Sequence, residues 1–149
     1  MLINIFYGLP TMAVCLVLEA LLLVVVLRYY VRHKTLINTP SFASTLRVVT
    51  GVMILLVIGN IAQVGIWALL FRLLGEFPDF NTAFYHSAVN FATLGYGDIV
   101  MSGNHKLLGP IEAINGVLMI GVSTAVLMTV FQDALKKTIK ARQRQGSNT

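Results

Sequence analysis

Three long apolar stretches constrain the fold of this chain more than any other feature of its sequence. They cover residues 11–27, 48–71 and 107–131. A membrane-spanning helix needs about 20 predominantly apolar residues, and each stretch is close to that length or exceeds it. The chain is 56% hydrophobic and only 11% charged, which is too apolar for a soluble domain. We therefore expect three transmembrane helices.

The first stretch is expected to be a retained helix and not a secretory signal peptide. No basic segment precedes it, no clear small-residue cleavage site follows it, and the cations Arg28, Arg32 and Lys34 come after it. Cys15 is the single cysteine, which excludes an internal disulfide and predicts a packed thiol.

The positive charges predict the orientation of the chain. One group surrounds the connection between the first two stretches, and a second group follows the third stretch. By the positive-inside rule, residues 32–46 and the C-terminal tail are expected in the cytoplasm, with the N-terminus outside. A basic tail after a membrane span attracts anionic lipid headgroups, so the net charge of +5 needs no nucleic-acid partner. The cations of the tail are Lys136, Lys137, Lys140, Arg142 and Arg144.

The segment between the second and third stretches predicts a short helix that enters the membrane without crossing it. Asp79 or Asn81 can cap its start, and residues 80–92 contain neither Gly nor Pro. These residues give a helix of roughly 20 Å, at about 1.5 Å per residue. Such a re-entrant segment must be surrounded by protein or water, which places it on an axis between subunits. The partial negative charge at its C-terminal end favours a cation there.

The run Thr-Leu-Gly-Tyr-Gly-Asp at residues 93–98 follows this helix directly. A stack of backbone carbonyl oxygens can replace the hydration shell of a cation if all of them point inward. That arrangement requires alternating left- and right-handed backbone conformations, which glycine adopts without steric cost. Gly95 and Gly97 bracket Tyr96 at this alternation. Thr93 adds a hydroxyl at the inner end, and Asp98 places a carboxylate at the outer mouth.

This run resembles the selectivity filter of potassium channels, and the resemblance extends over roughly residues 47–135. The usual form of that filter has Val or Ile at the position of Leu94. The resemblance implies that K⁺, the permeant ion, binds at Thr93, Leu94, Gly95 and Tyr96, and that Gly97 completes the filter. It also implies a homotetramer of prokaryotic type in a bacterial or archaeal plasma membrane, because the filter of this family takes four strands. No cofactor is expected.

Two residues of the short helix stand where potassium channels usually carry aromatic side chains behind the filter. By resemblance, Tyr85 is expected to hydrogen-bond Asp98, and His86 is expected to contact Tyr96. The alternative is that both residues only pack at the boundary between subunits. A metal-binding role for His86 is not expected, because no second His, Cys or carboxylate stands at ligand spacing.

The third stretch is expected to line the pore. Pro110 and Glu112 are typical of a helix start, and an ion-binding role for Glu112 is the alternative. Gly116 and Gly121 are candidates for a gating hinge, with close packing between membrane helices as the alternative. Helical spacing from Gly121 places three residues on the lining face, and a rotation would bring Ser123 or Thr124 inward instead. The three candidate lining residues are Ala125, Met128 and Thr129.

Glu19 lies well inside the first stretch, where a buried acid must be paired or neutral. We expect it to contact Gln63 or Asn60 in the second stretch as an uncharged link between helices. A proton-sensing role is the alternative.

Together these features predict an all-α membrane protein with three transmembrane helices, a re-entrant pore helix and filter loop, and a tetrameric pore. The expected regions are an N-terminal helix with its loop (1–46), a pore domain (47–135) and a basic tail (136–149). The expected function is a potassium-selective channel. A non-selective cation channel and a non-conducting channel-like subunit are the alternatives. No catalytic group, metal cluster or nucleotide-binding loop supports an enzyme.

Overall fold

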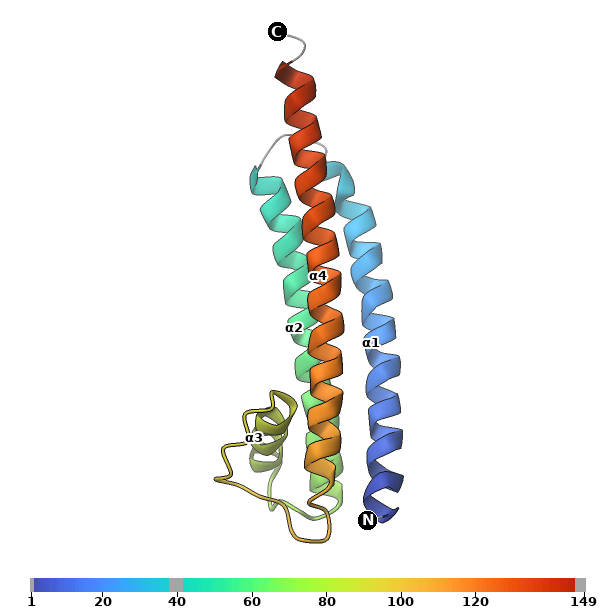
Figure 1. Ribbon diagram of the computed structural model, residues 1–149, viewed down its shortest axis with the longest axis vertical. Helices are drawn as coiled ribbons and strands as arrows, with labels where there is room; N and C mark the ends of the chain where they lie inside the picture. The colour runs from blue at the N-terminus through green and yellow to red at the C-terminus, as the bar shows by residue number, and fades with distance from the viewer. Residues whose placement is uncertain (1, 38–41, 147–149) are drawn as a thin grey trace. The chain divides into compact units, whose positions relative to one another are not determined.

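The computed structural model describes residues 2–37 and 42–146, and this part of the chain is all-α. In chain order the helices are α1 (Leu2–Ile37), α2 (Phe42–Leu73), α3 (Phe80–Phe91) and α4 (Leu108–Gly146) (Figure 1). Residues 38–41 of the expected cytoplasmic loop and residues 147–149 of the expected tail lie outside the described residues.

Helices α1, α2 and α4 are long and apolar enough to cross a membrane. They contain the three apolar stretches apart from residue 107 and extend beyond them, so the predicted all-α fold with three helices that can span a membrane is confirmed. Large apolar side chains on these helices are exposed, for example Val17 at 61% and Leu21 at 60% on α1. Lipid or neighbouring helices suit such a surface better than water does.

The chain divides into two compact units. The first consists of Met1–Ala20 and Gly59–Gly121, which brings the N-terminal part of α1 together with the end of α2, all of α3 and the start of α4. Large side chains fill its core and exclude water, and they include Trp67, Phe71, Phe91, Leu108 and Met119.

The second unit consists of Leu21–Ile58 and Val122–Thr149 and has its own apolar core. A polar contact joins α1 to α4 within it, because the Tyr30 hydroxyl donates to Asp133. Lys137 donates to the same carboxylate at 2.5 Å, and its ammonium group lies 5.3 Å from the centre of the Tyr30 ring. The charge of Asp133 is thus compensated where α1 meets α4.

Helix α3 begins where the sequence places a capping residue. Asp79 has extended backbone (φ −140°, ψ 162°), and its carboxylate accepts from the Thr82 backbone N–H at 2.8 Å. The Thr82 hydroxyl donates to the other carboxylate oxygen at 2.8 Å. With 12 residues, α3 is about 18 Å long and too short to cross a bilayer.

Candidate functional site: the filter segment and its supports

Residues 93–98 are called the filter segment below. The backbone of residues 93–97 alternates between left-handed and right-handed conformations. Gly95 has φ 59° and Gly97 has φ 75°, as the spacing of the glycines predicts. Thr93 is also left-handed, with φ 59°, and it is the one non-glycine residue with positive φ in the described part of the chain. The alternation therefore begins two residues before the first glycine.

Two hydrogen bonds place Thr93 in this conformation as α3 ends. The N–H of Thr93 donates to the Asn90 carbonyl at 2.8 Å, and the N–H of Leu94 donates to the Val89 carbonyl at 2.9 Å. These are the two bonds of a Schellman motif, in which the residue after the C-cap is left-handed and usually glycine. The motif explains the positive φ of Thr93.

The carbonyl groups of residues 93–98 accept no backbone hydrogen bond in the described part of the chain. The same residues are exposed in the single chain, with the Leu94 side chain at 55% and the Tyr96 side chain at 65%. Carbonyl oxygens without hydrogen bonds are free to coordinate a cation, and exposed apolar side chains are free to pack against other copies of the chain.

Asp98 and Tyr85 are brought together where the motif ends. The Tyr85 hydroxyl donates to Asp98 Oδ2 at 2.7 Å, which is the contact that the resemblance implied. This hydrogen bond lowers the pKa of Asp98 below its ordinary value and raises the pKa of Tyr85. The carboxylate at this position is therefore favoured in its charged form.

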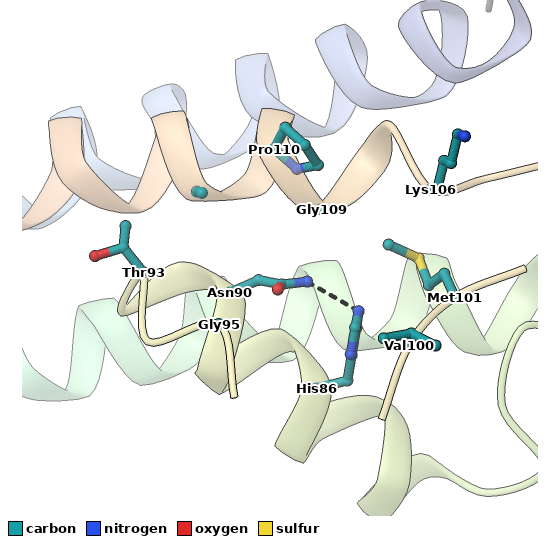
Figure 2. A pocket seen from close by; sticks show the side chains of 10 residues that line it. His86, Asn90, Thr93, Gly95, Val100, Met101, Lys106, Gly109 and Pro110 are labelled. Atoms are coloured by element: carbon teal, nitrogen blue, oxygen red, sulfur yellow. Dashed lines mark hydrogen bonds between the residues drawn. The ribbon is translucent and has the colours of Figure 1, made fainter. Parts of the chain in front are cut away.

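His86 is buried in α3, and it supports the segment just beyond the filter motif. Its Nδ1 lies 2.9 Å from the carbonyl oxygen of Ile99, and its Nε2 lies 2.9 Å from Asn90 Nδ2 (Figure 2). A carbonyl only accepts, so Nδ1 carries the proton and Nε2 accepts from the Asn90 amide. Burial keeps the pKa of His86 below its ordinary value. These contacts are with Ile99 and Asn90, whereas the resemblance implied one with Tyr96.

A cavity of about 390 Å³ lies between the filter segment and the start of α4. His86 and Asn90 line it from α3, Thr93 and Gly95 from the filter segment, and Pro110 from α4 (Figure 2). Part of the filter segment therefore borders open space and does not pack against its own chain.

Glu76 ties the chain after the filter to the turn before α3, a contact that the sequence analysis missed. Its carboxylate accepts from the Ser102 N–H at 2.6 Å and the Ser102 hydroxyl at 2.7 Å, and it also contacts His105 Nδ1. Burial alone raises the pKa of Glu76, but the hydrogen bonds from His105 and Ser102 outweigh it and lower the pKa. Glu76 and His105 are 29 positions apart in sequence, so no local pattern indicates that they pair.

One face of α4 packs closely on α3. A Cβ on Gly116 would collide with the carbonyl oxygen of Phe91, and a Cβ on Gly109 would lie 3.2 Å from Asn90 Nδ2. Glu112 lies between them in sequence and contacts the Ser87 hydroxyl. Gly116 therefore serves close packing, whereas a Cβ on Gly121 would meet open space.

The candidate lining residues beyond Gly121 differ in exposure. Ala125, Met128 and Thr129 are exposed in the single chain, whereas Ser123 is buried with 6% of its surface accessible. Thr124 is exposed as well. Ser123 therefore packs within its own chain, whereas exposure does not distinguish Thr124 from the three candidate lining residues.

The expected partner of Glu19 is present. Gln63 Nε2 donates to Glu19 Oε2 at 2.8 Å, and both side chains are buried. This confirms the predicted link between α1 and α2. In the described residues, no cluster of His, Cys, Asp and Glu could hold a metal ion.

Comparison with known proteins bears on this segment of the chain. A family model described as ion channel matches residues 61–133, just under half of the sequence. Comparisons with curated proteins and with solved structures gave no significant match. The matched segment runs from the end of α2 through α3 and the filter motif into α4. Together with the three apolar helices, this match supports the assignment of the chain to an ion channel family of membrane proteins.

Proposed function

We propose that four copies of this chain form a potassium-selective channel in which K⁺ passes between the carbonyl oxygens of residues 93–97. The alternating backbone at Thr93, Gly95 and Gly97 carries this proposal. An alternating backbone can turn successive carbonyls to the same side while the chain stays extended, as a line of cation ligands requires. The carbonyl oxygens of residues 93–97 also accept no backbone hydrogen bond from the described residues.

The charges around the filter segment support a cation as the permeant ion. The C-terminal end of α3 leads directly into Thr93, so the partial negative charge of that helix end lies beside the filter. Asp98 adds a carboxylate whose pKa is lowered by Tyr85. Both features attract cations and repel anions.

Planar bilayer recording from purified protein tests the proposal. Under a potassium gradient, the current is expected to reverse close to the potassium equilibrium potential, and replacing K⁺ by Na⁺ on one side should shift that potential. Current that reverses at the chloride potential would contradict the proposal.

Gly95→Ala provides the control for the role of the backbone. An added Cβ would meet no atom within 4 Å, so this substitution introduces no clash in the single chain. It does disfavour φ 59°, because side chains of L-residues crowd the backbone there. We expect G95A to insert and assemble but to carry no potassium current, and undiminished current would refute the assignment of the filter.

A non-selective cation channel is the second candidate, and Leu94 favours it. This side chain replaces the usual Val or Ile and is 55% exposed within its own chain. Equal permeability to K⁺ and Na⁺ in the same recordings would favour this candidate.

The basic residues after position 135 are proposed to bind anionic lipid, whichever of the two channel functions is correct.

A further inference from the structure

We propose that Glu112 is a protonated, uncharged acid that anchors α3 to α4 and thereby acts as a positioning residue for the filter. The positioning role rests on the proposed channel function. The protonation state is a separate property, and it can be measured on protein that carries no current.

The two contacts of the Ser87 hydroxyl favour this state. Ser87 Oγ lies 2.8 Å from the carbonyl oxygen of Val64 in α2 and in short contact with Glu112 Oε1. The hydroxyl has one hydrogen, and a backbone carbonyl has none to donate. With an ionised Glu112, two acceptor oxygens would therefore face each other at one of these contacts. With a protonated Glu112, its O–H donates to Ser87, and Ser87 donates to Val64.

The surroundings of Glu112 agree with a neutral acid. Glu112 and Ser87 are both fully buried, with 0% of their surface accessible. No Lys, Arg or His in the described residues forms an ion pair with Glu112. Among the described residues its second oxygen, Oε2, makes no hydrogen bond of normal geometry, and the Asn90 amide is the polar group close to it. A buried carboxylate with one oxygen unpaired and no cation nearby is very costly, whereas a carboxylic acid is not.

The position of Glu112 connects it to the filter. Gly109, Glu112 and Gly116 share one face of α4, and all three lie against α3. Ser87 is one turn before the end of α3, and Thr93 follows that end directly. The hydrogen bonds from Glu112 through Ser87 to Val64 thus join α4, α3 and α2 just below the first filter residue.

Infrared spectroscopy of the purified protein tests the protonation state. Wild type is expected to show a carbonyl stretching band that buried carboxylic acids produce. The part of this band that comes from Glu112 should disappear in Glu112→Gln. Ser87→Ala should shift that part of the band to higher frequency, because the acid loses its acceptor. Glu19→Gln is the matched control, since it changes the other buried glutamate of the same unit and should leave this part in place. A spectrum in which E112Q removes no acid band would overturn the proposal.

Bilayer recordings of the same variants test the positioning role. E112Q is expected to keep most of the potassium current and selectivity, because an amide N–H can donate to Ser87 as the acid does. Glu112→Ala should lower the current about tenfold or more, since the link is lost and a cavity replaces it. E19Q should resemble wild type. Equal loss of current in E112Q and E112A would refute the role.

The two proposals fail in different ways. A wild-type protein without potassium current would overturn the channel function, while the infrared band would still decide the state of Glu112. If E112A does not assemble, S87A supplies the test, because it removes only one oxygen. S87A should lower the current while E19Q does not, and full current in S87A would refute the positioning role.

Discussion

Thr93 is the most strained residue of the filter segment. Its φ of 59° is disfavoured for a β-branched residue, and such strain costs of the order of 1–3 kcal/mol. The hydrogen bonds from the N–H groups of Thr93 and Leu94 back to α3 hold it in place. Because the end of α3 holds this strain, residues 94–98 leave the helix in a defined direction, as the proposed filter requires.

In the proposed filter the coordinating atoms are backbone oxygens, so Leu94 is expected to act on selectivity only through packing. Val and Leu differ by one methylene, which is worth about 0.8 kcal/mol. A thousandfold preference between ions requires several times that energy, at about 1.4 kcal/mol per tenfold change. We therefore expect wild type to prefer K⁺ over Na⁺ and Leu94→Val to change the permeability ratio only modestly. A non-selective wild type made selective by L94V would contradict this.

Tyr85 is expected to set the external pH at which Asp98 loses its charge. The hydrogen bond from Tyr85 lowers the pKa of Asp98, so the carboxylate stays charged until the pH falls through that lowered value. In Tyr85→Phe the pKa of Asp98 should rise toward its ordinary range. The acid-induced decline of potassium current should then begin at higher pH than in wild type. Tyr7→Phe is the control, and identical pH profiles for wild type and Y85F would contradict the prediction.

At the scale of elements, the contact between α4 and α3 depends on the absence of a side chain at one position. A Cβ on Gly116 would collide with a backbone oxygen of α3, which cannot move aside without displacing the helix, whereas a Cβ on Gly121 would meet open space. The two glycines are five residues apart in the same helix and form a matched pair.

Gly116→Ala is expected to destabilise the folded protein by about 1–3 kcal/mol, the usual cost of overpacking. Gly121→Ala should be neutral or slightly stabilising, because Ala has the higher helix propensity. Thermal unfolding of both variants in detergent measures the difference. If Gly121 is a gating hinge, G121A should lower the open probability without lowering the melting temperature. Equal stability of the two variants would show that the close packing at Gly116 is unimportant.

At the scale of the whole molecule, the proposed filter requires more than one copy of the chain. Residues 92–98 are exposed, and one strand of carbonyls cannot surround an ion. We expect native mass spectrometry in gentle detergent to show a stable tetramer. A stable monomer or dimer as the largest species would count heavily against the pore arrangement.

Several features of this protein are determined by the sequence alone because they depend on neighbouring residues. Length and hydropathy decide that three helices can span a membrane, and Asp79 begins α3 at the expected place. The left-handed backbone of Gly95 and Gly97 follows from the motif itself. Each of these features is local, so periodicity, capping and glycine chemistry are sufficient to predict it.

The tertiary structure decides which distant residues meet. The Glu76 contact with His105 and the Glu112 contact with Ser87 join residues 29 and 25 positions apart. They depend on the rotation of each helix about its axis and on the path of the connecting segments, which hydropathy does not specify. The same holds for Gly116, whose packing role appears only once α4 lies against the end of α3. Side-chain chemistry limits the possible partners, and the packing of the helices selects among them.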